Sequence, residues 1–169
     1  MFSNWGPGKS TAVVVLLLLG FGLAALADQP IPERYAKAKE FMDYLKTTCE
    51  PSSAGYDQSK CGKWDIEKVM SNISKNGLVV YDVNTHKTLK FNLKKLRKQL
   101  AARTGEAFGA LAHFSYIYGQ PYPQYSNISY VTSDTGIVIS ITGGYKLTFP
   151  FEQDVLKLAK IEYLQEEGD

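Results

Sequence analysis

The hydrophobic period of this chain changes within the stretch LVVYDVNTHKTLKF, residues 78–91, and this change decides the fold. Two runs rich in β-branched and aromatic residues flank the polar segment 84–87, which predicts a β-hairpin. Upstream of the hairpin, apolar residues recur at spacings of three and four, as in helices. Far downstream they alternate, as in strands. Helices followed by an antiparallel meander are typical of an α+β domain.

Two helices are expected before the hairpin. Pro32 opens the first, and Asp65 is the predicted N-cap of the second, which Asn76-Gly77 would terminate as its C-cap. The inward face of the first helix comprises Ile31, Tyr35, Ala38, Met42, Leu45 and Cys49. The inward face of the second comprises Ile66, Val69, Met70 and Ile73.

After the hairpin, Leu93, Leu96 and Leu100 predict a third helix that ends at Thr104-Gly105. The alternation from Phe108 to Tyr118 predicts a strand. Further strands are predicted near residues 128–132, 136–141, 145–151 and 155–164. The sequence therefore predicts a single domain in which three helices from the N-terminal half pack on one face of a curved, antiparallel, cone-like sheet.

This order of elements resembles that of the nuclear transport factor 2-like superfamily, which includes ketosteroid isomerases and many binding or scaffolding proteins. The stretches GYKLTF (144–149) and KLAKIEY (157–163) are similar to the closing hairpin of that superfamily. The resemblance implies a cone whose open end forms a pocket, and a homodimer paired through open sheet faces. Ketosteroid isomerase-type relatives use an acid on a strand with tyrosine donors in such a pocket.

Residues 1–27 have the features of a secretory signal peptide. Lys9 supplies a basic start, residues 12–27 are an apolar run, and small residues occupy the −3 and −1 positions before Asp28. The run is shorter than the roughly 20 residues that span a bilayer as a helix. Cleavage is therefore predicted, with a retained membrane anchor as the alternative. The domain would be residues 28–169, in the bacterial periplasm or secreted.

Loss of Lys9 would lower the formal net charge from +2 to +1. A nearly neutral domain has no general attraction for nucleic acid.

The two cysteines, Cys49 and Cys61, predict one disulfide in an oxidising compartment. Two thiols without paired spacing do not predict a metal site, and no cofactor is predicted.

Candidates for catalysis are sparse. Asp82 interrupts an apolar strand, and in a buried pocket its pKa would be raised so that it could move a proton. The alternative is an aspartate on the wet side of a strand end, before the turn at Asn84. His113 lies on a predicted strand, on the face opposite Phe114 and Tyr116, as either a general base or a histidine satisfied by packing.

Aromatic residues are concentrated between positions 108 and 130. Tyr116 and Tyr118 would point to one side of a strand, into the core or toward a ligand. Tyr122 and Tyr125 lie in the proline-containing loop 119–125. Tyrosine combines apolar area with a hydroxyl group at low entropic cost, which suits binding.

A basic segment forms a second candidate surface. No acidic residue falls between Asp82 and Glu106. The cations of this segment are Lys87, Lys90, Lys94, Lys95, Arg97, Lys98 and Arg103. Such a face could contact an anionic lipid, an acidic polysaccharide or an acidic partner, or could simply be solvated.

Three hypotheses follow. The first is an exported, non-enzymatic domain that binds a small ligand or a protein partner through the aromatic loop and the basic helix. The second is a small cofactor-free isomerase or hydratase that uses Asp82 and tyrosines. The third is a structural role at a membrane surface through residues 87–103.

Overall fold

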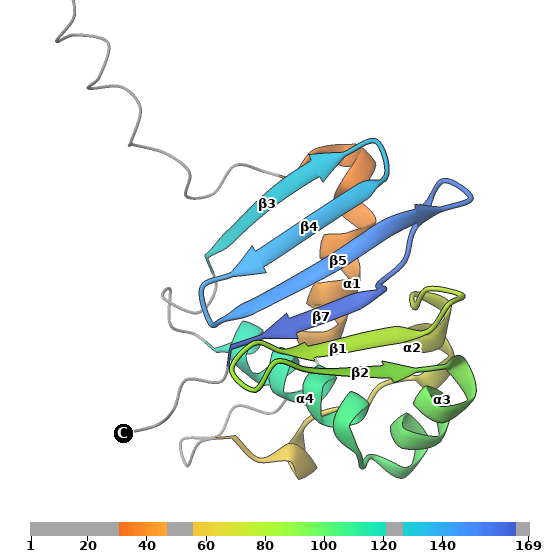
Figure 1. The fold of residues 1–169 in the computed structure, drawn as a ribbon, viewed down its shortest axis with the longest axis vertical. Coiled ribbons are helices and arrows are strands. Elements are labelled where there is room, and N and C mark those ends of the chain that lie inside the picture. Colours follow the sequence, from red (N-terminus) through yellow and green to blue (C-terminus); the bar gives the residue numbers. More distant parts are fainter. Residues whose placement is uncertain (1–30, 47–55, 121–126, 165–169) are drawn as a thin grey trace, which may run out of the picture.

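Helices cover one face of a curved sheet in the computed structural model of the chain, while the other face is open (Figure 1). The structure describes residues 31–46, 56–120 and 127–164. In chain order the elements are η1 (Glu33–Tyr35), α1 (Ala36–Lys46), η2 (Gln58–Lys60), α2 (Ile66–Ser71), β1 (Leu78–Asp82), β2 (Lys87–Phe91), α3 (Leu93–Ala102), α4 (Glu106–Gly119), β3 (Ile128–Ser133), β4 (Gly136–Ile141), β5 (Tyr145–Glu152), β6 (Val155–Leu156) and β7 (Lys160–Tyr163).

The predicted α+β class is confirmed. The hairpin at residues 78–91 forms β1 and β2, with Leu78 opposite Phe91 and Asp82 opposite Lys87. The helix before it begins as predicted, because the Asp65 carboxylate accepts a hydrogen bond from the Lys68 backbone N–H at 3.1 Å. The helix after it, α3, is capped by Asn92.

The strand predicted from Phe108 to Tyr118 is wrong, because these residues belong to α4. The α4 helix contacts both α1 and α3, so residues on nearly all of its sides are buried, among them Phe108, Leu111 and Ala112. A helix buried all round has no polar face, and its sequence therefore lacks the helical period. The alternation of residues 108–118 therefore resembled a strand pattern by chance.

The sheet is mixed, so the prediction of a wholly antiparallel sheet is also wrong. Its strand order is β2-β1-β7-β5-β4-β3, with the short β6 paired to β5. The last strand, β7, runs antiparallel to β5 but parallel to β1. The single strand predicted over residues 155–164 is divided between β6 and β7.

The predicted C-cap at Asn76-Gly77 is wrong as well. The α2 helix ends at Ser71, with Asn72 as its C-cap. Gly77 instead leads into β1 with a φ of +90°, and a Cβ there would lie 2.0 Å from the Phe91 carbonyl oxygen. Glycine is required at this position by a close backbone approach.

The core lies between the helices and the covered face of the sheet. Alternate residues of the central strands face it, and they are fully buried in β4, β5 and β7 at Ile139, Leu147 and Ile161. Within the described ranges, no helix is long and apolar enough to cross a membrane. The predicted signal peptide, residues 1–27, lies outside the described residues.

Candidate ligand-binding site

One face of α4 forms the wall of a cavity of about 330 Å³. Glu106, Gly109, Ala110 and His113 line it, and their spacings of three and four residues place them on one side of the helix. A Cβ built on Gly109 would meet no atom of the described residues within 4 Å. The missing side chain at this position therefore leaves open space within the cavity.

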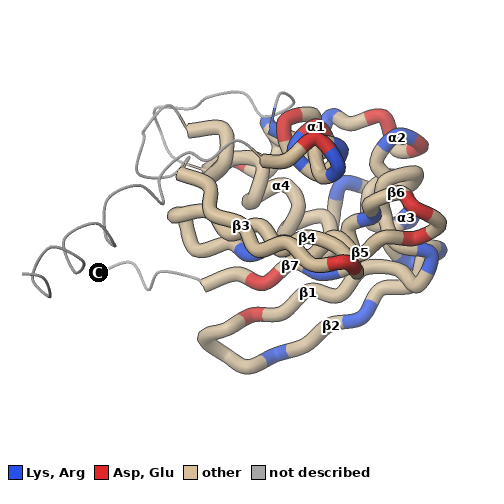
Figure 2. The backbone as a smooth tube through the Cα atoms, turned by 90° about the horizontal axis from the view of Figure 1, so that it is seen from above, with Lys and Arg blue, Asp and Glu red and all other residues tan. Residues whose placement is uncertain are grey.

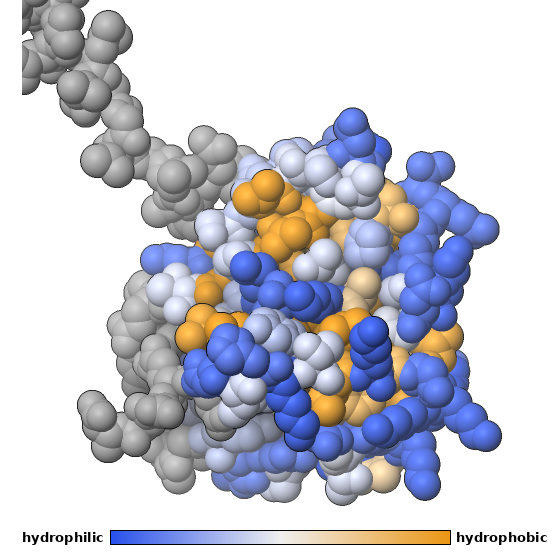
Figure 3. All heavy atoms as spheres, viewed as in Figure 1, coloured by the Kyte–Doolittle hydropathy of each residue, from blue (hydrophilic) through white to orange (hydrophobic). Residues whose placement is uncertain are grey.

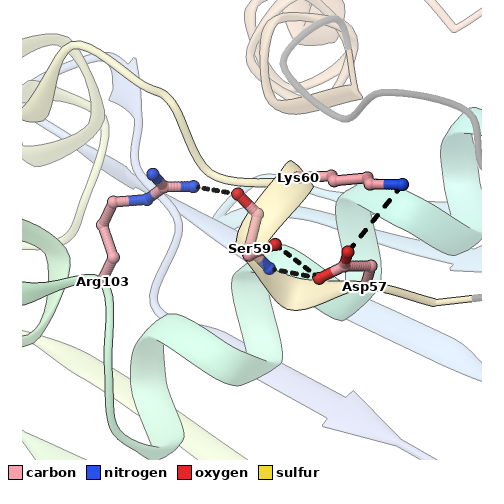
Figure 4. Close-up of polar contacts among 4 residues, drawn as sticks. All are labelled: Asp57, Ser59, Lys60 and Arg103. Atoms are coloured by element: carbon pink, nitrogen blue, oxygen red, sulfur yellow. Dashed lines mark hydrogen bonds and ion pairs between the residues drawn. The ribbon is translucent and has the colours of Figure 1, made fainter.

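The opposite wall comes from the segment around η2, which supplies Tyr56 and Gln58. The Asp57 carboxylate caps this short helix by accepting hydrogen bonds from Ser59 N–H at 2.9 Å and Ser59 Oγ at 2.6 Å. Arg103, at the end of α3, donates to the Ser59 and Cys61 carbonyl oxygens at 2.7 and 2.8 Å. Figure 4 shows the contacts of Ser59 with Asp57 and with Arg103. These hydrogen bonds attach the wall to the end of α3, directly before α4.

Two sheet tyrosines complete the cavity lining. Tyr145 of β5 and Tyr163 of β7 are opposite each other in the sheet register, and their ring centroids are 6.0 Å apart. The Tyr145 hydroxyl and His113 Nδ1 share a hydrogen bond of 2.5 Å. The His113 ring meets Tyr56 edge to face at 4.8 Å between centroids. Aromatic side chains from the η2 segment, from α4 and from the sheet therefore contact one another around the cavity.

These side chains are uncharged at neutral pH, and burial favours the uncharged forms further. Burial lowers the pKa of the His113 imidazole, which is therefore neutral at pH 7. Burial, followed by the charge of Asp57, raises the pKa of Tyr56 to about 12. Burial, followed by the neighbouring Tyr163 and Tyr56, raises the pKa of Tyr145. The cavity thus offers aromatic surface and neutral hydrogen-bonding groups.

Asp82 does not line this cavity. Its carboxylate accepts hydrogen bonds from the Asn84 backbone N–H at 3.0 Å and from Thr85 Oγ1 at 2.7 Å, within the β1–β2 turn. These bonds, led by the one from the Thr85 side chain, lower the pKa of Asp82. A proton-transferring Asp82 would need a raised pKa, whereas its pKa is lowered. Its position matches the alternative, an aspartate at a strand end before the turn.

The two tyrosines at the end of α4 have different surroundings. Successive helical residues are about 100° apart, so Tyr116 and Tyr118 do not point to one side, and that prediction is wrong. Tyr118 is only 4% exposed and donates a hydrogen bond to Asp43 of α1 at 2.9 Å. Tyr116 is half-buried, with its ring centroid 5.3 Å from that of Tyr56. Tyr116 therefore supports the cavity wall, and Tyr118 belongs to the core.

Some predicted residues lie outside the described residues, namely Tyr122, Tyr125 and Cys49. Cys61 is disulfide-bonded, and the chain has one other cysteine, Cys49. The pairing of Cys49 with Cys61 stays a prediction. Because Cys61 follows η2 directly, its cross-link is attached to the segment that forms the cavity wall.

The predicted basic residues divide into two groups. Lys87 and Lys90 lie on β2, and the others lie on α3 or at its end (Figure 2). Arg97 forms a two-pronged ion pair with Glu67 of α2, and Arg103 holds η2. Arg97 thus links α3 to α2, and Arg103 links α3 to η2. The exposed lysines keep the charge of the predicted surface, and its contact with an anionic partner stays a prediction.

The open face of the sheet carries mixed chemistry (Figure 3). Val131 of β3 is 72% exposed, whereas on β7 the Lys160 ammonium pairs with Glu162 at 3.0 Å. Apolar and charged side chains therefore alternate across this face. The homodimer expected through the open sheet stays a prediction.

Most of the cavity residues were missed by sequence reasoning. Of its lining, the sequence singled out only His113, and as part of a strand. Read as a helix, positions 106, 109, 110 and 113 would have formed one stripe. No sequence pattern predicts that Tyr56 and Tyr163 lie next to this face of α4, because only the tertiary structure places them there. In the described part of the chain, no group of three His, Cys, Asp or Glu side chains could hold a metal ion.

Comparisons with protein-family models, curated proteins and solved structures found no match to this chain. The cavity is therefore interpreted from its own chemistry.

Proposed function

We propose that this chain is an exported binding domain that takes a small ligand in the cavity between η2, α4 and the strands β5 and β7. One observation carries the proposal: three separate parts of the chain place aromatic rings around the open space left by Gly109. Ligand sites in proteins are typically concave, largely apolar, and equipped with a few fixed polar groups. The cavity volume of about 330 Å³ suits a small molecule.

The arrangement of rings also supports binding over simple packing. Tyr145 is 3% exposed, whereas Tyr56, on the opposite wall, is 37% exposed. The cavity thus runs from a wet rim to a dry base. A ligand that entered it would exchange water for ring contacts, and the buried Tyr145–His113 pair would provide a fixed polar point.

Export is part of the same proposal. It is supported by the signal-like pattern of residues 1–27 and by the disulfide at Cys61, since disulfides persist mainly in oxidising compartments. The isomerase hypothesis has weaker support, because Asp82 is held in the β1–β2 turn by Asn84 and Thr85.

A pair of variants at Gly109 tests the site. Ligand-observed NMR of the purified protein against a panel of small aromatic and amine fragments should yield binders. Gly109→Leu should weaken those binders by about tenfold or more, because its side chain would occupy the open space. Gly109→Ala, which adds one methyl group, serves as the control and should retain most of the affinity. If fragments bind the folded Gly109→Leu variant as well as wild type, the cavity is not the binding site.

A further inference from the structure

The charges around the cavity indicate which ligand it accepts. The only fully ionised side chain in its lining is that of Glu106, at the start of α4, and the described lining contains neither lysine nor arginine. The Glu106 carboxylate accepts a hydrogen bond from its own backbone N–H, which is the main cause of its lowered pKa. It is therefore ionised at pH 7. His113, the one lining group that could become cationic, stays neutral.

Two further carboxylates act on the cavity from outside. Besides burial, the negative charge of Asp57 raises the pKa of Tyr56, and that of Asp82 raises the pKa of Tyr163. Both carboxylates therefore place negative charge near the rings. Cations also lie nearby: Lys60 is 3.9 Å from Asp57, and Lys95 and Lys87 act on Glu106. The preference for a cation therefore rests on Glu106, the charged group in the described lining itself.

Tyrosine rings add to this preference. The face of an aromatic ring carries negative electrostatic potential and attracts organic cations, most strongly where water is excluded. The rings of Tyr56, Tyr145 and Tyr163 all line one space. Tyr56 and Tyr163 are the more accessible of the three, and Tyr145, which is 3% exposed, lies at the base. With the carboxylate of Glu106 at the rim, the lining combines the two features that recognise a methylated ammonium group.

We propose that the ligand of this cavity is a small organic cation of the methylated ammonium class, held by Tyr56, Tyr145 and Tyr163 with Glu106 as its counter-charge. This inference rests on the proposed function, since it names the chemistry of the same site. An anionic ligand would be repelled by the Glu106 carboxylate. A neutral ligand would gain ring contact but no charge attraction.

Three probes of similar shape separate these cases: choline, its neutral carbon analogue 3,3-dimethyl-1-butanol, and the anion pivalate. Each is titrated into ¹⁵N-labelled protein, with the backbone amides of Gly109 and His113 as reporters. Choline should bind about tenfold more tightly than the neutral analogue, as expected for a partly desolvated cation–π site. Pivalate should not shift the reporters.

Glu106→Gln provides the matched control. It should weaken choline binding severalfold and leave the affinity for 3,3-dimethyl-1-butanol unchanged, because only the cation interacts with the carboxylate. Equal affinities for choline and the neutral analogue would overturn the cation assignment but leave the binding site standing. Preference for pivalate, or choline shifts confined to residues outside the cavity, would also overturn it. If no probe shifts the reporters but other fragments do, the assignment fails while the proposed function survives.

Discussion

His113 links the cavity to the folding free energy of the domain. Its imidazole bonds to the Tyr145 hydroxyl and lies against the Tyr56 ring. Burial lowers its pKa below the ordinary value of about 6.5. Protonation therefore favours the unfolded chain, in which the imidazole is hydrated.

This coupling predicts an acid-sensitive stability. Below the ordinary pKa of about 6.5 the unfolded chain binds more protons at this position than the folded chain, so the free energy of unfolding falls as the pH falls. Above it the imidazole is neutral in both states and contributes no pH dependence. Urea unfolding of wild type and His113→Gln between about pH 5 and pH 7.5 should show a smaller loss in the variant. Parallel pH profiles would contradict the assignment.

Arg103 stabilises the wall of the cavity through its side chain. Its backbone adopts the left-handed conformation, with φ 53° and ψ 40°, at the C-cap of α3. Glycine would be favoured there by about 1 kcal/mol. The arginine, however, donates two hydrogen bonds to the backbone on either side of Lys60.

Arg103→Gly should therefore lower stability despite the better backbone fit. The loss of two charge-assisted hydrogen bonds outweighs the conformational gain, for a net destabilisation of about 1–2 kcal/mol, measurable by urea unfolding. Lys98→Ala, on the exposed side of the same helix, controls for the loss of a cationic side chain and should leave the stability nearly unchanged. An Arg103→Gly variant as stable as wild type would show that Arg103 does not hold η2.

At the scale of elements, α4 determines both the core and the cavity. Two glycines, Gly109 within α4 and Gly62 beside it, differ in the space available for a side chain. A Cβ at Gly109 has free space, whereas a Cβ at Gly62 would lie 2.5 Å from the Phe108 ring, with a φ of +76°. The first glycine is replaceable for folding, and the second is required.

Gly109→Ala should accordingly raise the free energy of unfolding by about 0.5–1 kcal/mol, since alanine is the better helix former. Gly62→Ala should lower it, because the methyl group collides with Phe108 and the backbone conformation is strained. Thermal unfolding of both variants gives the comparison. A destabilised Gly109→Ala variant would indicate that this position is packed rather than open.

The same helix shows where sequence reasoning ends. The hairpin at residues 78–91, the Asp65 cap and the strands β3 to β5 could be predicted, because each is determined by local period or local hydrogen bonding. The α4 helix could not, because tertiary burial removed its polar face. If α4 is not predicted as a helix, the sequence does not show that Glu106, Gly109 and His113 lie on the same face.

At the scale of the whole molecule, β7 unites the two halves of the sheet. It pairs with β1 from the hairpin and with β5 from the meander, and it carries Tyr163 to the cavity. This long-range pairing leaves no local trace, so neither the parallel contact nor the position of Tyr163 could be predicted from sequence.

The disulfide at Cys61 acts on the same whole-molecule scale. If its partner is Cys49, it closes the loop of residues 49–61, which contains η2, and stabilises the fold by about 3 kcal/mol through the unfolded state. Reduction should lower the melting temperature and weaken ligand binding together. Intact mass spectrometry without reduction should find an oxidised chain that begins at Asp28. A reduced chain with an intact N-terminus would contradict both the export and the pairing.

The central claim is that the space between η2, α4 and the strands β5 and β7 is a ligand site. A crystal structure of the purified protein grown with choline tests it most directly. We predict density for the trimethylammonium group among the rings of Tyr56, Tyr145 and Tyr163, beside Glu106. A cavity filled by other side chains of the protein, or a ligand bound elsewhere with this space empty, would contradict the claim.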